Sequence, residues 1–267
     1  MNEMPGNLAE LEEQSSLLFW FLDVKDILPV PKTLVLVLSE PEKEELISAL
    51  DDKPLSKELI GRLTTYGAKT GYPLFLRTDN ISGKHSWKDT CYVPDEKSLV
   101  VHALSLIEES MCAGFMGVSF DAFVFRQFLS LETTFNAFHG DMPVSKERRY
   151  FVRDGKVVCH HSYWPEDSIR PPSSRILPDD WKARLTKLND ESPDEVKHLT
   201  GLAEKWPHPD YWSIDFACDK EGNWWFIDAA RGELSWHPED CPFNPRPRKK
   251  EQKPDGMLLE FFTKKRE

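Results

Sequence analysis

The dipeptide Asp154-Gly155 constrains the fold most, because it separates two segments with the composition of β-strands, residues 148–152 and 156–159. Both positions of a two-residue hairpin loop need positive φ, which Asp and Gly tolerate. The dipeptide therefore predicts a tight β-hairpin in which Arg153 pairs with Lys156.

Counting back from this turn places four polar side chains on one face of the hairpin. Arg149 is expected opposite His160, and Glu147 opposite Ser162, because strand side chains alternate between faces. A carboxylate, a guanidinium, an imidazole and a hydroxyl would then lie together. The pattern fits a functional site as well as it fits a solvated, salt-bridged sheet face.

A second hairpin is predicted around the loop at residues 220–223. If Asp219 pairs with Trp224 across a four-residue loop, Asp215 faces Asp228. Directly opposed carboxylates repel each other. Oxygen ligands of this kind suit Mg²⁺, which would relieve the repulsion.

Two other features of this hairpin bear on the Mg²⁺ interpretation. Separate salt bridges to the two acids, for example from Arg231, are the alternative to a metal ion. The other face of the hairpin is expected to be apolar, with the side chains of Ile214, Phe216, Cys218, Trp225 and Ile227.

The remaining chain alternates helix-like and strand-like segments. Apolar spacing and capping residues predict helices at 7–22, 42–50, 56–68, 95–111 and 193–206, and apolar runs predict strands at 34–38, 73–77, 91–93 and 120–129. The Pro- and Ser-rich segment 164–180 is interpreted as a surface loop or a lid.

The strand at 73–77 ends in Arg77 and leads into a polar loop that contains Ser82, Gly83 and Lys84. Cations neutralise phosphate oxygens, and glycine lets backbone N–H groups approach them. The loop lacks the Gly-x-x-x-x-Gly-Lys-[Ser/Thr] spacing of a Walker A motif. A plain surface turn is the alternative interpretation.

Composition argues against several classes of protein. With a net charge of −11 and a pI of about 5.3, general nucleic-acid binding is not expected. The basic residues at 246–250 are interpreted as a solvated tail. The odd number of cysteines and the lack of metal-knuckle spacing between them indicate reduced thiols. Without a signal-peptide pattern, and with only the short apolar run 17–22, the chain is expected to be cytoplasmic and not to enter a membrane.

The order of these motifs resembles the ATP-grasp superfamily over about residues 61–235. Residues 147–152, Glu-Arg-Arg-Tyr-Phe-Val, look most like the Glu-x-Arg-x-Phe-Val strand of its atypical branch. That branch includes cell-division-cycle proteins that assist assembly of a translation initiation factor. The resemblance implies an α+β fold with ATP between two α+β lobes and a small N-terminal α/β segment.

By this resemblance, each motif acquires a role toward ATP and Mg²⁺. Arg77 stands where the family usually has a phosphate-binding Lys, and Arg149 would contact the reacting phosphate. Asp215 and Asp228 match the two acidic Mg²⁺ ligands. The remaining matches are the phosphate-covering loop at Ser82, Gly83 and Lys84, backbone groups near Gln127 and Leu129 for the base, and Glu132 for the ribose.

Two departures from the family pattern concern charge and metal ligands. Arg77 keeps the charge of Lys but not its geometry. Ala230 stands where the family commonly has Asn, so that water or Glu233 would have to supply the missing ligand. The expected domains are an N-terminal segment 1–60, a small lobe 61–130, a C-terminal lobe 131–245 and a tail 246–267.

The leading functional hypothesis is an ATP-dependent ligase. A substrate carboxylate would form an acyl phosphate, which an amine or similar nucleophile captures, with Lys84 and Arg149 as the catalytic cations. The alternative is an ATP-binding assembly factor that acts on a protein partner. No catalytic-loop motif supports a kinase.

Overall fold

The computed structural model describes residues 8–114, 120–139 and 141–244. The chain divides into two compact units, residues 1–235 and 236–267. The predicted tail, 246–267, lies outside the described residues. None of the described helices is long and apolar enough to cross a membrane.

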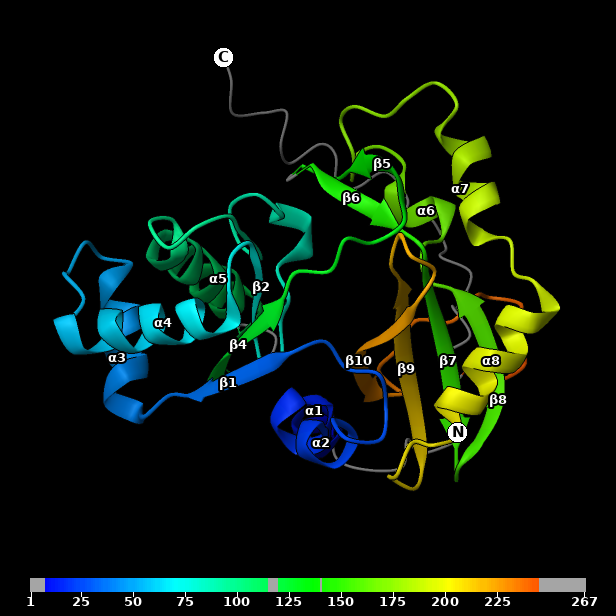
Figure 1. The fold of residues 1–267 in the computed structure, drawn as a ribbon, viewed down its shortest axis with the longest axis horizontal. Helices are drawn as coiled ribbons and strands as arrows, with labels where there is room; N and C mark the ends of the chain where they lie inside the picture. Colours follow the sequence, from blue (N-terminus) through cyan, green and yellow to red (C-terminus); the bar gives the residue numbers. More distant parts are fainter. Residues whose placement is uncertain (1–7, 115–119, 140, 245–267) are drawn as a thin grey trace, which may run out of the picture. The chain divides into compact units, whose positions relative to one another are not determined.

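The first sheet of the larger unit is antiparallel, with strand order β1-β4-β2-β3. Helices α3, α4 and α5 pack against it (Figure 1). These elements span β1 Thr33–Val37, α3 Glu40–Ala49, α4 Lys57–Thr70, β2 Leu74–Thr78, η1 Lys84–Ser86, β3 Tyr92–Val93, α5 Leu99–Gly114 and β4 Ala122–Gln127. Each of the strands and helices predicted for this region is confirmed to within a few residues.

The second sheet is also antiparallel, with strand order β10-β9-β7-β8. Helices α1 and α2 contact β10, and α8 contacts β7 and β8 (Figure 1). The elements span α1 Leu8–Ser15, α2 Leu17–Val24, β7 Glu147–Arg153, β8 Lys156–Ser162, α8 Pro193–Ala203, β9 Tyr211–Cys218 and β10 Trp224–Arg231.

The predicted helix at 7–22 is two helices, because Ser16 caps the second one. Its hydroxyl accepts a hydrogen bond from the N–H of Leu18 and donates one to a carboxylate oxygen of Asp79. The second helix then buries Leu17 and Trp20 completely against the second sheet. Burial of this N-terminal apolar run thus fixes its position in the core.

The predicted Asp154-Gly155 turn is confirmed, with φ of 48° and 74° at its two residues. Arg153 pairs with Lys156 as predicted, but a bulge follows between Val152 and Phe151. Arg149 consequently lies opposite His161 instead of His160. Arg148, and not Glu147, lies opposite Ser162. The predicted four-residue face was therefore wrong beyond the bulge, because one extra residue reverses the facing of a strand.

The last hairpin reaches the predicted pairing of Asp215 with Asp228 by another route. Trp224 pairs with Cys218 instead of Asp219, and a bulge between Phe226 and Asp228 compensates for this shift. As a result Phe226, and not Trp225 or Ile227, joins Ile214 and Phe216 in the core.

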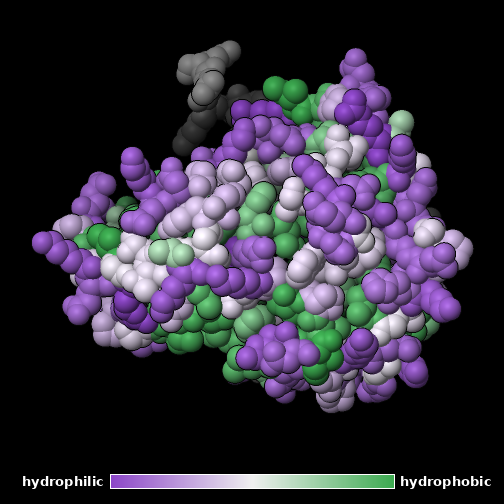
Figure 2. Space-filling model, viewed as in Figure 1, coloured by the Kyte–Doolittle hydropathy of each residue, from purple (hydrophilic) through white to green (hydrophobic). Residues whose placement is uncertain are grey.

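A small sheet of β5 (Thr133–Ala137) and β6 (Met142–Ser145) connects the two larger sheets along the chain. Helices α6 (Glu166–Ile169) and α7 (Trp181–Asn189) follow β8 in the sequence. The predicted loop 164–180 is partly wrong, because it contains α6 and buries Trp164 and Ile169. Hydrophilic side chains cover most of the face seen in Figure 2.

Candidate functional site

A cavity of about 270 Å³ lies within the larger unit and takes its walls from all three sheets. Strands β2 and β4 contribute the first wall, and the connection after β4 continues it. Strands β5, β6 and β10 complete the lining. Among the predicted site residues, those that line the cavity are Arg77, Ser82, Lys84, Gln127, Leu129 and Asp228.

Arg77 reaches the cavity because β2 alternates between core and cavity. Leu74 and Leu76 are fully buried in the core, whereas Phe75 and Arg77 line the cavity. The Arg77 Nε donates to the carbonyl of Thr78 at 2.9 Å. Its Nη1 lies 2.9 Å from an Asp228 carboxylate oxygen. The predicted cation and one predicted metal ligand thus form an ion pair.

The polar loop after β2 is anchored at its first residues by Asp79. This side chain is 1% exposed, and one carboxylate oxygen accepts N–H groups of Asp121 and Ala122 at 2.9 and 3.1 Å. The other oxygen accepts the hydroxyl of Ser16. Asp79 is therefore a structural carboxylate that holds the loop against β4 and α2.

Gly83 gives the loop a shape that few other residues can adopt. Its φ is 60°, and the Thr90 hydroxyl donates to its carbonyl at 2.7 Å. An added Cβ would meet side-chain atoms of Leu106, Glu109 and Thr90 at 3.0 Å each. The turn places the next residue, Lys84, over the rings of Tyr163 and Trp164.

Replacement of Gly83 by Ala should destabilise the protein by about 1–2 kcal/mol, because a left-handed backbone and a crowded Cβ both oppose the side chain. Urea unfolding measures the change. Gly61→Ala is the matched control, since Gly61 is exposed on α4 and nothing lies within 4 Å of its Cβ position. That control should gain about 0.5–1 kcal/mol. Equal stability of Gly83→Ala and the wild type would contradict the prediction.

Lys84 is paired with a carboxylate of β7. Its Nζ lies 3.3 Å from a Glu147 oxygen and 4.5 Å from the centroid of the Tyr163 ring. Burial opposes the charged form, but the carboxylates of Glu147, Asp215 and Asp228 outweigh it together with Tyr163, so the pKa of Lys84 is raised. The ammonium group therefore stays charged at neutral pH.

Arg149 and Asp215 form a two-pronged ion pair between neighbouring strands. The Nε and Nη2 atoms of Arg149 donate to the two Asp215 oxygens, at 2.8 Å each. The guanidinium also lies 4.8 Å from the centroid of the Tyr163 ring. Burial disfavours the charge of Arg149, yet Asp215 more than compensates and the pKa of Arg149 is raised. The predicted acids are thus separately salt-bridged, although not by Arg231.

Arg231 pairs with Glu233 and Asp210 instead. Glu233 is buried by this contact, and both Arg231 Nε and Nη2 donate to its carboxylate. Neither residue lines the cavity. Glu233 is therefore held away from the role of substitute ligand suggested for it beside Ala230.

Arg126 is a cavity residue that the sequence analysis missed. It lies on β4, is 5% exposed, and donates through Nη1 to the carbonyl of Ile227 at 2.6 Å. Its buried Nε has no hydrogen-bond partner among the described residues. Burial and the charge of Arg77 lower the pKa of Arg126 to about 10. A charged residue inside the apolar run 120–129 was the signal for it.

The part of the cavity near the predicted base site is aromatic. Phe75, Trp87 and Phe128 line it, and the Trp87 ring lies 5.9 and 6.2 Å from the other two ring centroids. The N–H of Gln127 donates to the carbonyl of Lys32 at 2.8 Å. Any hydrogen bond from Gln127's backbone to a base would therefore use its carbonyl.

Three predicted residues stand outside the cavity lining. Asp215 and Arg149 are one ion pair away from it, since Asp215 faces Asp228 across the ladder. Glu132 is exposed, and its backbone pairs with Cys218 and Lys146. The structure thus brings together the phosphate and metal candidates but does not place Glu132 among them.

The residues fit a nucleotide triphosphate and a divalent cation. Arg126 offers a buried, unpaired donor in the cavity wall, and Arg77, Lys84 and Arg149 are further cations. Phosphate oxygens match such donors. The carboxylates Asp215 and Asp228 are hard oxygen donors of the kind that Mg²⁺ takes.

Comparisons with known proteins agree with this geometry. A family model for the ATP-grasp domain, family 3 of its clade, matches residues 65–247. The structure of Cdc123 from Schizosaccharomyces pombe is similar, with a TM-score of 0.51, 14% identity, and coverage of 85% of this chain and 87% of that one. A C-terminally truncated Cdc123 from the same organism gives a TM-score of 0.52 with 13% identity over the same shares. No curated protein matches the sequence.

Proposed function

Because the chain belongs to this family of ATP-grasp domains, we propose that it binds ATP with Mg²⁺ in the cavity and acts as an ATP-dependent ligase. The motif-based resemblance to the ATP-grasp superfamily and to its Cdc123-containing branch is confirmed by these matches, and so is the α+β fold. The ligase activity and the assignment of residues remain our proposal.

One observation carries the proposal. Arg77, Lys84 and Arg149 each hold a carboxylate in the same part of the unit, and two of those carboxylates are the facing pair Asp228 and Asp215. On binding, phosphate oxygens would take the cations and Mg²⁺ would take the acids, so that every charge changes its partner without being left alone. Arg126 adds a further positive charge beside Asp228.

In the proposed reaction, an oxygen of a substrate carboxylate attacks the terminal phosphorus of ATP, and the bond to the bridging oxygen of ADP breaks. An amine then attacks the acyl carbon and inorganic phosphate leaves. Mg²⁺ would neutralise charge on the phosphates. Lys84 and Arg149 would orient the transferred phosphoryl group and stabilise its charge, which is the main protein contribution in such transfers.

Calorimetry with ATP, with and without Mg²⁺, tests binding, and ADP release in the presence of carboxylate and amine pools tests the ligase activity. Lys84→Met should lower ADP release by about 100-fold or more, because it removes one of the charge-stabilising donors. Lys88→Met is the control, since Lys88 is exposed and pairs with the exposed Asp141. ADP release by Lys84→Met at the wild-type rate would refute the assignment.

An assembly factor that acts on a protein partner is the second candidate. Ala230 supports it, because a ligand that the family commonly has there is replaced by a methyl group. The structural likeness to Cdc123 concerns the fold alone. ATP binding without ADP release in any carboxylate and amine pool, together with ADP release on addition of a protein fraction, would favour this candidate over the ligase.

A further inference from the structure

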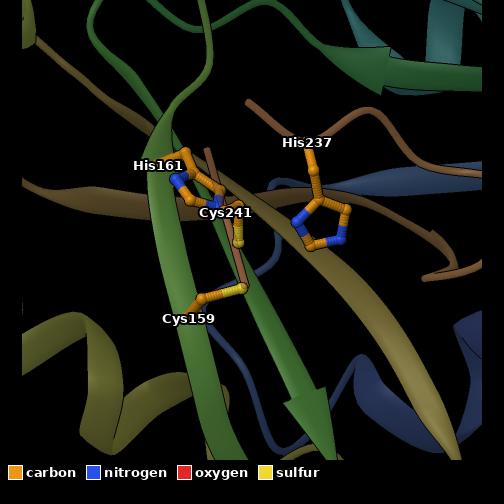
Figure 3. Close-up of side chains that lie close together, drawn as sticks. All are labelled: Cys159, His161, His237 and Cys241. Carbon is orange, nitrogen blue, oxygen red and sulfur yellow. The ribbon is translucent and has the colours of Figure 1, made fainter. Parts of the chain in front are cut away.

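Strand β8 carries a sulfur and an imidazole that the proposed nucleotide site does not use. Cys159 and His161 are two residues apart beyond the bulge, so their side chains project from the same face of β8 (Figure 3). The Cys159 sulfur and a ring nitrogen of His161 lie within 4.8 Å of each other. His160, between them, projects from the other face, where it contacts Glu191 and stacks on Tyr150.

The smaller unit carries a second pair of the same composition. His237 and Cys241 are four residues apart in a turn, in which the N–H of Cys241 donates to the carbonyl of Pro238 at 3.1 Å. The turn brings the Cys241 sulfur and a His237 ring nitrogen within 4.8 Å of each other (Figure 3). Each unit thus presents one thiol and one imidazole as a ready pair of ligand atoms.

We propose that one Zn²⁺ ion is held by both pairs, in a Cys₂His₂ site. Bonds of about 2.3 Å to sulfur and 2.0–2.1 Å to nitrogen place tetrahedral ligand atoms about 3.5 Å apart, which each pair reaches with a small adjustment. Either pair alone fills half of a tetrahedral shell. Thiolate and imidazole select zinc over magnesium, so the site is separate from the Asp215–Asp228 acids.

The zinc ion has a structural role. Four protein ligands leave no open position for water or substrate, as in closed structural zinc sites. Because the two pairs belong to different units, the ion links these units and closes a chain loop that includes Asp215 and Asp228. The interpretation of the cysteines as plain reduced thiols had considered only Cys–Cys spacing, and here each cysteine is paired with a histidine.

Metal analysis of the purified full chain tests the site. The wild type should contain about one zinc ion per chain, and Cys159→Ser and Cys241→Ser should each lose most of it. Cys112→Ser is the matched control, because Cys112 is an exposed thiol on α5 and its zinc content should equal that of the wild type. Wild-type zinc content in both ligand variants would overturn the proposal.

A second measurement separates loss of a ligand from loss of the fold. His237→Ala should lose the ion, whereas His237→Cys should retain it in a Cys₃His shell. Cobalt substitution should give tetrahedral d–d bands and a thiolate charge-transfer band, and the latter should weaken in Cys159→Ser. A protein that binds neither zinc nor cobalt after full reduction, or in which Cys159 and Cys241 are joined by a disulfide, would overturn the proposal.

Discussion

Asp228→Asn should strengthen ATP binding in the absence of Mg²⁺ and weaken the effect of Mg²⁺. Without the metal, the wild-type carboxylate repels the phosphates and holds Arg77 at 2.9 Å. Asn removes the charge and releases the guanidinium, so that ATP alone should bind about tenfold tighter, or ~1.4 kcal/mol. With the metal, the wild type should gain affinity because the acid moves from Arg77 to Mg²⁺. The variant should lose most of this gain, since an amide oxygen is a weaker ligand for a hard cation.

Calorimetric titrations of ATP at matched ionic strength, with Mg²⁺ and with a chelator, give both numbers. Asp167→Asn is the matched control, because Asp167 is exposed and its partner Arg170 is exposed as well. That variant should keep the wild-type affinities under both conditions. If Mg²⁺ strengthened ATP binding equally in Asp228→Asn and in the wild type, Asp228 would not be a metal ligand.

The order of strands and helices could be predicted because local signals agree with the final packing. The Asp154-Gly155 turn works from sequence, since its φ angles follow from residue type. Helix α8 begins where Ser192, Pro193 and Glu195 indicate. In these places neighbouring residues alone determine the structure, and no distant contact is needed to locate them.

Register beyond a bulge could not be predicted, because the core decides it. Placing Phe226 in the core costs one extra residue in β10, and the bulge after Phe226 restores the facing of Asp215 and Asp228. The bulge between Phe151 and Val152 has no such compensation within its hairpin, and the expected partner of Arg149 changed from His160 to His161. Counting from a turn cannot detect either bulge.

The partners of the site cations were also beyond the sequence. Alternation correctly assigned Arg149 to the functional face, but its partner Asp215 comes from β9, the next strand of the sheet. Tyr163, which lies under both Lys84 and Arg149, follows the last residue of β8 and carried no motif. Such contacts arise from sheet order, which pairs strands that are distant in the chain.

Arg148→Met should lower the free energy of unfolding by about 3–5 kcal/mol, because it leaves buried acids without their partner. Arg148 is fully buried, and its Nε lies 2.8 Å from Glu195 and 3.0 Å from Glu191. Its Nη2 donates to the carbonyls of Leu188 and Asp190 at 3.1 and 2.8 Å. Its neighbour Arg149 faces the nucleotide site instead, as strand alternation requires.

Urea unfolding followed by circular dichroism measures the loss. Arg175→Met, at an exposed position, is the control and should stay within about 0.5 kcal/mol of the wild type. A double variant, Arg148→Met with Glu195→Gln, should recover part of the loss, because the second change removes one uncompensated charge. If Arg148→Met unfolded at the urea concentration of the wild type, the ion pairs that join β7 to the start of α8 would contribute nothing to stability, and the two neighbouring arginines could not be separated into a structural and a functional one.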